Sequence, residues 1–369
     1  MSFTVYDDNE NVLGSKSTKL KVVNSPHSPS SEKHVLCVGS STTEGGQWVC
    51  ECQRRLLASD GTPQGNGLNN IVFVGSQQKT LYGQTANLYG KSGWSWRDFA
   101  TEGRGASSFR FYLSGTGNPV VQGNQYTNNG HTYTVTELNT IEGVETILCS
   151  TDSSISTPAA SGTLTPVSGA SYPALTYTNA AQDSANLFWD SVNNRLNFTN
   201  YVNTYCGGSI DIMYTLLGIN ELFKGVDYQE QYVRAFVEQL HTEYPNCIVV
   251  LASGAYPSMI DMMPGYGASG NQFSNTYRVI CEMFKVFSMY KRLANEYDYV
   301  EFELWAAQVD SDYNFPLTMK NVNTRNSEVQ EPYANNTIHP GNGTPKANAR
   351  GYMQEADAAY RSIVAHFCQ

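Results

Sequence analysis

The sequence predicts an α/β fold interrupted by an inserted all-β module. Apolar runs of strand length alternate with amphipathic helical segments at both ends of the chain, a pattern typical of parallel strands buried on both faces. Between these stretches, from about residue 109 to residue 177, only short strands and turn residues occur. A chain of 369 residues is also long for one domain, which favours two compact units or one unit with a large insertion.

We divide the chain into four parts on this basis. Residues 1–30 are expected to form a β segment and a linker. Residues 31–104 and 183–369 would form the two parts of one α/β core, and residues 105–182 the inserted β-rich module.

The N-terminal part is predicted to be β structure followed by a linker. Apolar or alternating residues at 3–5 and 19–23 flank a turn at Asn9–Asn11. Residues 24–31 are rich in proline and serine, which is typical of a linker. The part is either the end of an upstream β module or a strap that packs on the core.

The core elements follow from the spacing of apolar residues. Continuous apolar runs indicate buried strands, and apolar residues at helical spacing indicate amphipathic helices. Strands are expected at residues 34–39, 71–75, 210–217, 247–251 and 300–304. Helices are expected at residues 43–58, 227–244, 275–297 and 351–367.

The insertion shows strand alternation at Phe109, Phe111 and Leu113. Its strongest hairpin signal is Asn129-Gly130 within residues 126–135, because both residues tolerate the positive φ of a type I′ turn. A small sandwich is the expected architecture. Glycan binding and a role as a rim or spacer are equally open for this module.

Composition excludes several classes of partner. The net charge is −10, only 15% of residues are charged, and no run of Lys and Arg occurs. Nucleic acid and anionic membranes are therefore not expected partners, because both need basic patches. No apolar stretch approaches the roughly 18 residues that span a bilayer, and no signal peptide is expected in this chain. The uncharged polar surface suits carbohydrate contact and an extracellular or virion-associated setting.

The cysteines give no sign of a metal or redox site. The eight cysteines form neither a CxxC pair nor zinc-finger spacing with histidine. Cys37 and Cys247 lie inside apolar runs, which favours buried free thiols, while the even count leaves disulfides open. No phosphate-cradling glycine loop occurs either, so no cofactor is expected.

Two distant residues are suited to nucleophilic catalysis. Ser41 follows the strand at 34–39 and would begin a helix, which places its hydroxyl at the carboxyl edge of the sheet, where ligands bind in open α/β folds. A serine hydroxyl needs an adjacent base. His339 lies in a loop before the last helix that can return to the same edge. The structural alternatives are a helix cap for Ser41 and a surface or packing histidine for His339.

Oxyanion donors are available between these two residues. The N–H of Gly90 can approach a substrate closely because glycine has no Cβ. Asn220 follows a strand and can donate from its side-chain amide. In isolation, each is equally well explained as a turn residue.

Together these segments resemble the SGNH (GDSL) hydrolase superfamily. The matching blocks are Gly39–Gly45, Gly90–Trp94, Gly218–Glu221 and His339-Pro340, and the resemblance covers residues 34–101 and 185–369. It implies a three-layer α/β/α sandwich with a mostly parallel sheet. It also implies that Ser41 is the nucleophile, that His339 is the general base, and that the oxyanion hole consists of the Ser41 N–H, the Gly90 N–H and Asn220 Nδ2.

The sequence departs from the family pattern at three positions. Ser40 and Glu221 each stand where the family has aspartate, and Asn336 replaces the aspartate that orients the histidine. Asn336 can hold His339 through its carbonyl oxygen but brings no charge. In a serine protease the analogous change lowers kcat about 10⁴-fold.

Three interpretations of the missing acid remain open. The enzyme could use a Ser–His dyad oriented by Asn336 or a backbone carbonyl, it could recruit an acid from elsewhere, or its catalysis could be weakened. The candidate acids in the same C-terminal region are Asp310, Asp312, Glu328 and Glu331.

Substrate-binding candidates are aromatic or basic. Trp94 and Trp96 could stack on a sugar ring, and Arg325 could bind an acidic sugar. Tyr256, Met259 and Tyr266, which share one loop, could line an acyl or sugar pocket. Packing in the core is the alternative for the tryptophans, packing on the sheet edge for the loop, and a surface ion pair for Arg325.

The sequence therefore predicts a serine esterase that removes O-acetyl groups from a carbohydrate, with an acylated carbohydrate or another small ester as substrate. The alternative is a glycan-binding or structural module, of the adhesin or virion-appendage type, with a weakly active or inactive core. The two ideas combine in a virion tail protein that deacetylates a capsule.

Overall fold

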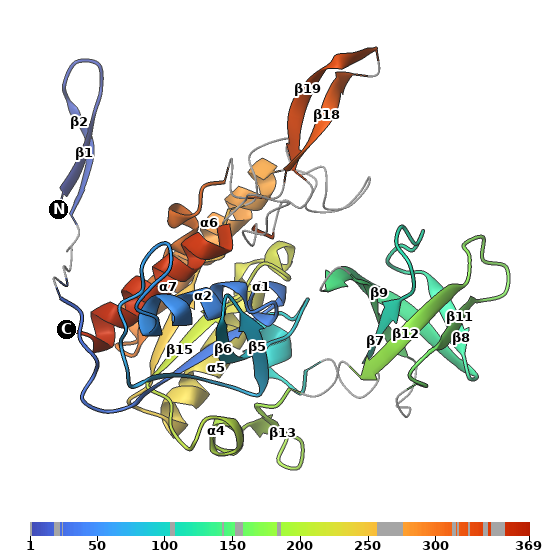
Figure 1. Ribbon diagram of the computed structural model, residues 1–369, viewed down its shortest axis with the longest axis horizontal. Coiled ribbons are helices and arrows are strands. Elements are labelled where there is room, and N and C mark those ends of the chain that lie inside the picture. The colour runs from blue at the N-terminus through green and yellow to red at the C-terminus, as the bar shows by residue number, and fades with distance from the viewer. Residues whose placement is uncertain are drawn as a thin grey trace.

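The computed structural model describes the core, the insertion and three peripheral hairpins (Figure 1). The described residues are 2–17, 23, 25–103, 108–141, 144–151, 158–182, 186–256, 276–311, 315, 317–323, 325–334, 339–340 and 351–369.

A seven-stranded mixed sheet forms the centre of the core, in the order β17-β16-β15-β3-β6-β5, with β4 also paired to β3. The strands are β3 (Lys33–Gly39), β4 (Ile71–Val74), β5 (Gln77–Leu81), β6 (Gln84–Gly90), β15 (Ile212–Leu216), β16 (Ile248–Ala252) and β17 (Val300–Glu303). The pairings of β3, β15, β16 and β17 with their neighbours are parallel, and only the β5–β6 pairing is antiparallel. The predicted α/β class is confirmed.

Helices cover both faces of this sheet. The core helices are α1 (Ser41–Glu44), α2 (Gln47–Leu57), α3 (Trp96–Ala100), α4 (Phe198–Tyr205), α5 (Val226–Glu243), α6 (Thr276–Glu296) and α7 (Gly351–Phe367), with 3₁₀ turns η1 (Leu222–Lys224) and η3 (Trp305–Gln308). Helices α2 and α7 pack side by side on one face (Figure 1). Helices α4, α5 and α6 cover the other face.

Strand β3 shows why the core strands read as continuous apolar runs. Val35 and Cys37 point into the cluster under α2 and α7, whereas Leu36 and Val38 point into the cluster under α5 and α6. All four side chains are completely buried, because successive residues of a strand face opposite sides.

The insertion forms a closed antiparallel barrel, in the order β10-β7-β12-β11-β8-β9. Its strands are β7 (Ser108–Leu113), β8 (Gln125–Asn128), β9 (His131–Ile141), β10 (Val144–Thr151), β11 (Gly162–Pro166) and β12 (Leu175–Gln182). The expected small sandwich is therefore wrong. Strand β7 pairs with both β10 and β12, and β8 pairs with both β9 and β11, so the sheet closes on itself.

Two local predictions for the insertion are confirmed. Asn129 and Gly130 both have positive φ, 49° and 80°, and join β8 to β9 in a two-residue turn. Phe111 points inward and packs edge-on against Tyr133 and Tyr177, with ring centroids 5.2 and 4.9 Å away.

Three two-stranded hairpins lie at the periphery. They are β1 (Ser2–Tyr6) with β2 (Val12–Ser17), β13 (Trp189–Asp190) with β14 (Arg195–Leu196), and β18 (Leu317–Asn323) with β19 (Asn326–Ala334). The partner of β1 is Val12–Ser17, where residues 19–23 were expected, because the chain reverses over residues 7–11, with Glu10 at φ 64°. The β1–β2 and β18–β19 hairpins project away from the core (Figure 1).

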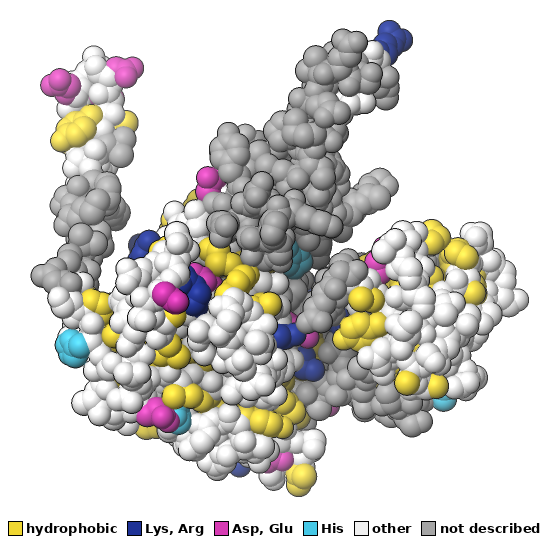
Figure 2. Space-filling model, in the orientation of Figure 1, with side chains coloured by type: hydrophobic (Ala, Val, Ile, Leu, Met, Phe, Trp, Pro, Cys, Tyr) yellow, Lys and Arg dark blue, Asp and Glu magenta, His cyan; other side chains and the backbone are white. Residues whose placement is uncertain are grey.

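Other described features agree with the composition. All eight cysteines are free thiols, and all except Cys281 are buried. Within the part of the chain that the structure describes, no helix combines the length and the apolar character needed to cross a bilayer. Most of the described surface in Figure 2 is uncharged.

Candidate active site

Ser41 and His339 meet although 298 positions separate them in the chain. Ser41 Oγ lies 2.8 Å from His339 Nε2. Burial of the imidazole disfavours its charged form and lowers the pKa of His339 to about 4. The ring is therefore neutral at pH 7, and in the Nδ1-protonated tautomer Nε2 accepts the Ser41 hydroxyl proton.

The strand-to-helix turn after β3 exposes the Ser41 hydroxyl. The Ser40 carbonyl accepts the N–H groups of Thr43 and Glu44, at 3.1 and 2.8 Å, so α1 begins at Ser41. A Cβ on Gly39 would lie 2.1 Å from Thr43 Oγ1 and 2.9 Å from the Leu216 carbonyl. Only glycine permits this tight turn at the carboxyl edge of the sheet.

Gly90 lies beside this turn, but its N–H is already engaged. Strand β6 pairs with β3 through Gly90 and Gly39. The Gly90 N–H donates to Gln77 Oε1 at 2.8 Å. A Cβ at Gly90 would also lie 2.3 Å from the Glu44 backbone. Gly90 therefore allows α1 to approach β6, and its N–H is not available to an oxyanion unless the Gln77 side chain moves.

The turn that follows Gly90 is fixed to the site from several sides. The Lys91 N–H donates to the Gly39 carbonyl at 2.9 Å, and the Trp94 N–H closes the turn onto the Lys91 carbonyl at 3.1 Å. The Ser92 N–H donates to Glu44 Oε2 at 2.8 Å. Gly93 occupies the left-handed region at φ 75°. This conformation explains the second glycine of the block Gly90–Trp94.

Asn220, in the segment that follows β15, contacts the same turn. Its Nδ2 donates to the Trp94 carbonyl at 2.8 Å. The amide carries two N–H protons, and this bond uses one. The structure thus brings Asn220 to the Lys91–Trp94 turn and Ser41 to His339, as separate contacts at one edge of the sheet.

Glu221, which stands where the resembled family has aspartate, is a buried carboxyl group. Its Oε1 accepts the Trp96 N–H at 2.7 Å, at the start of α3. Burial raises the pKa of Glu221 to about 8, and nearby Asp98 adds to the shift. Gln229 Nε2 donates to the carbonyls of Gly218 and Glu221, at 3.3 Å each. This network supports the segment that carries Asn220.

The predicted substrate-binding residues do not gather in one place. Trp94 is completely buried and packs against Phe99 with ring centroids 5.0 Å apart, so its ring presents no face to solvent. Trp96 is also buried, and its Nε1 donates to Tyr290 Oη at 2.6 Å. Both tryptophans occupy packing positions.

The remaining candidates are spread over different elements. Tyr256 is half-buried, with its ring 5.7 Å from that of Phe284 on α6. Arg325 is exposed in the turn between β18 and β19. Met259 and Tyr266 lie outside the described residues.

The candidates for orienting His339 lie partly outside the described residues. Asn336 and Asp312 lie outside the described residues. For Glu328 and Glu331 the structure describes the backbone, in β19. Asp310 is exposed, and its N–H donates to Gln354 Oε1 at 2.8 Å.

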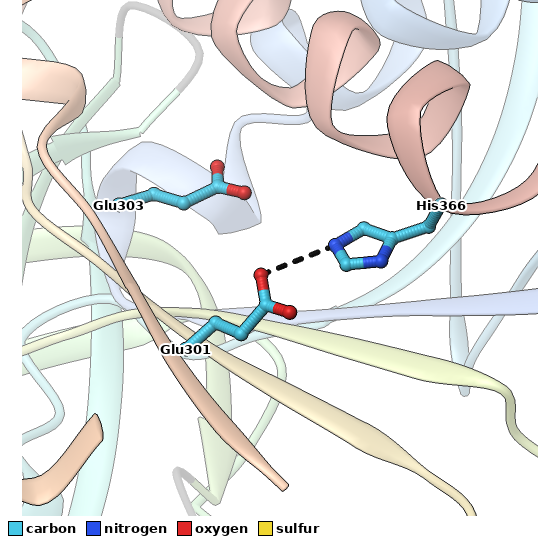
Figure 3. Close-up of side chains that lie close together, drawn as sticks. All are labelled: Glu301, Glu303 and His366. Atoms are coloured by element: carbon cyan, nitrogen blue, oxygen red, sulfur yellow. Dashed lines mark ion pairs between the residues drawn. The ribbon is translucent and has the colours of Figure 1, made fainter. Parts of the chain in front are cut away.

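One group of potential metal ligands occurs among the described residues. It consists of Glu301, Glu303 and His366 (Figure 3). His366 Nε2 lies 3.2 Å from Glu301 Oε2. Glu303 accepts hydrogen bonds from Trp305 Nε1, at 2.7 Å, and from Ser362 Oγ. These contacts join β17 to α7 and explain the group as packing.

Comparison with known proteins gives structural neighbours only. No protein-family model and no curated protein matches the chain. A Clostridium thermocellum family 3 carbohydrate esterase matches with 14% identity and a TM-score of 0.41, covering 90% of this chain and 97% of that one. A peptidoglycan O-acetylesterase matches with 13% identity and a TM-score of 0.36, covering 90% and 91%.

A carbohydrate acetylesterase family member from Sinorhizobium meliloti matches with 10% identity and a TM-score of 0.37, covering 90% of this chain and 99% of that one. TM-scores below 0.5 at these identities do not establish a shared activity. A catalytic activity can therefore be inferred only from the geometry of the site.

Proposed function

We propose that the chain is a serine ester hydrolase of the SGNH type that removes O-acyl groups, acetyl in the simplest case, from a carbohydrate. The observation that carries the proposal is the 2.8 Å contact between Ser41 Oγ and His339 Nε2 at the carboxyl edge of the sheet. A hydroxyl bonded to a neutral imidazole at a ligand-binding edge is the arrangement that activates serine.

The proposed reaction has two halves. Ser41 Oγ bonds to the ester carbonyl carbon while His339 Nε2 takes the hydroxyl proton. The proton then passes to the departing sugar oxygen as its bond to the carbonyl carbon breaks, which leaves an acyl-Ser41. In the second half, water attacks the acyl carbon, His339 takes a proton from the water, and that proton returns to Ser41 Oγ as the carboxylic acid leaves.

Charge on the carbonyl oxygen needs N–H donors in both halves. We assign this role to the Ser41 N–H and to Asn220 Nδ2. The bond from Asn220 to the Trp94 carbonyl fixes this side chain against the Lys91–Trp94 turn. One such donor is typically worth about 10²–10³ in kcat.

The carbohydrate substrate is the finer part of the proposal. It is supported by the low fraction of charged residues, 15%, and by a surface rich in uncharged polar side chains. Release of acetate from O-acetylated polysaccharides, measured enzymatically, tests it directly.

The decisive experiment measures hydrolysis of 4-nitrophenyl acetate by wild type, Ser41→Ala and His339→Ala. Both variants should lose roughly 10³-fold or more in kcat, and a fluorophosphonate should label wild type but not Ser41→Ala. Ser288→Ala, which removes an exposed hydroxyl on α6, is the matched control and should act like wild type. Equal background rates in wild type and both site variants would leave the glycan-binding alternative.

A further inference from the structure

A small cavity lies at the carboxyl edge of the sheet, lined by residues that flank Ser41 in the chain. Its volume is about 40 Å³, and Ser40 and Thr42, the two chain neighbours of Ser41, both line it. Gly218 and Ile219, which directly precede Asn220 in the chain, also line the cavity. The cavity therefore lies between the segment that carries the proposed nucleophile and the segment that carries a proposed oxyanion donor.

Most of the cavity wall is apolar. Leu216 at the end of β15 and Val286 and Phe287 of α6 contribute to it. Such a wall suits the hydrocarbon part of an acyl group. A volume of 40 Å³ has room for on the order of three water-sized groups. The methyl group of an acetyl ester would fill only part of it.

Two polar atoms interrupt this wall without a protein partner. Among the residues that the structure describes, neither Ser40 Oγ nor Glu355 Oε2 has a hydrogen-bond partner. Both residues line the cavity, and each is only 1% exposed. The other carboxyl oxygen, Glu355 Oε1, accepts the Ala255 N–H at 3.3 Å. Buried polar groups are rarely unpaired, because each one costs free energy.

Glu355 can act as a donor as well as an acceptor. Burial raises the pKa of its carboxyl group to about 8, so the group carries a proton at pH 7. Ser40 also offers one donor and two acceptor positions. A hydroxyl group in the cavity would offer these side chains both a donor and an acceptor.

We propose that this cavity receives the acyl chain of the substrate ester, and that the chain is a short hydroxyacyl group whose hydroxyl bonds to Ser40 Oγ and Glu355 Oε2. The inference rests on the proposed ester hydrolysis and adds the chemical class of the acyl group. A site that hydrogen-bonds a substrate hydroxyl rejects the analogue without it, because its own buried polar groups then stay unpaired. Glu355 and Ser40 are thus specificity-determining residues.

The test compares two esters that differ only in that hydroxyl. They are 4-nitrophenyl 3-hydroxybutyrate and 4-nitrophenyl 3-methylbutyrate, in which a methyl group replaces the hydroxyl. Wild type should show at least tenfold higher kcat/KM for the hydroxylated ester. Glu355→Leu should bring that ratio to one or below, Ser40→Ala should reduce it, and Glu355→Gln should keep most of it.

Controls separate specificity from folding. Glu51→Gln changes another buried carboxyl group, which pairs with Arg54 on α2, and should leave the ratio unchanged. Hydrolysis of 4-nitrophenyl acetate by each variant reports on the intact Ser41–His339 pair. If Glu355→Leu does not fold, the kcat/KM ratio of Ser40→Ala for the two esters still tests the inference.

The outcomes distinguish this inference from the proposed function. Ser41-dependent hydrolysis of 4-nitrophenyl acetate without any preference for the hydroxylated ester would overturn the inference. It would mean that water forms the hydrogen bonds to Ser40 Oγ and Glu355 Oε2. Absence of Ser41-dependent hydrolysis with every ester would overturn the proposed function and the inference together.

Discussion

At the scale of single residues, His339 is an unusual base for this reaction. Burial lowers the pKa of His339 to about 4, well below its ordinary value of 6.5. In a complete triad a carboxylate beside the ring would favour the imidazolium and raise the pKa. The sequence has Asn336 where the resembled family has that carboxylate. The base is therefore ready at neutral pH but accepts a proton less strongly than a triad histidine.

This pKa predicts the acid limb of the pH profile. Only the neutral imidazole can take the Ser41 proton, so activity falls as pH drops through the His339 pKa. We expect kcat/KM for 4-nitrophenyl acetate to be flat from pH 6 to pH 8, with an acid limb centred near pH 4. Circular dichroism over the same range controls for unfolding. A limb centred near pH 6.5 would show that an acid raises the pKa of His339.

The residues of the site differ in how far the sequence revealed them. Ser41 could be predicted because a glycine-rich turn after a buried strand exposes a side chain, whatever surrounds it. The hydrogen bond from the Gly90 N–H to the Gln77 side chain could not be predicted, because it depends on the rotamer of one side chain across a hairpin. The burial of Glu221 could not be predicted either, since it depends on how α3 and α5 pack.

At the scale of elements, helices were the easiest to predict. The expected helix at 227–244 is Val226–Glu243, and the expected helix at 275–297 is Thr276–Glu296. Both have long apolar stripes, so their boundaries follow from the sequence pattern. The β5–β6 hairpin was missed. Strand β5 is polar, and Tyr82 and Gly83, both at positive φ, form the turn without the usual Asn-Gly signal.

Arg110 shows that the barrel contacts the site turn. Phe109, Phe111 and Leu113 of β7 point into the barrel, so Arg110 points outward. It is nevertheless only 5% exposed, because its guanidinium donates to the Ser92 carbonyl, at 3.2 Å, and to Thr146 Oγ1, at 3.3 Å. The inserted module therefore helps to hold the Lys91–Trp94 turn.

We predict that Arg110→Met lowers kcat for 4-nitrophenyl acetate roughly tenfold. The variant keeps the apolar stem but removes a charged hydrogen bond, worth about 1.5–3 kcal/mol, from the turn. KM should change little, since the turn fixes Asn220, which would act in the transition state, and Arg110→Lys should restore part of kcat. Arg195→Met, at an exposed position of β14, is the control. An unchanged kcat in Arg110→Met would mean that the barrel is a passive neighbour of the site.

At the scale of the whole molecule, the fold keeps two carboxyl groups buried near the site. Glu221 supports the start of α3, and Glu355 of α7 faces the cavity. Burial raises the pKa of each to about 8. The charged groups that act on Glu221 are Asp98 of α3, which raises its pKa, and Lys224 of η1, which lowers it.

These carboxyl groups make folding stability depend on pH. A glutamate that titrates near 4.5 when unfolded and near 8 when folded holds a proton in the folded state over the interval between them. The folded state then binds more protons than the unfolded state, so raising the pH favours unfolding. The stabilising contribution is complete below pH 4.5 and is lost progressively as the pH rises to 8.

Glu221→Gln tests this linkage because glutamine can still accept the Trp96 N–H but does not titrate. The free energy of unfolding of the variant, measured with urea, should increase relative to wild type by about 1 kcal/mol per pH unit between pH 5 and pH 8. Exposed Glu102→Gln provides the matched control and should follow wild type. A difference between Glu221→Gln and wild type that does not vary with pH would mean that Glu221 is ionised in the folded protein. Its bond to α3 would then be that of a carboxylate paired with the helix N-terminus.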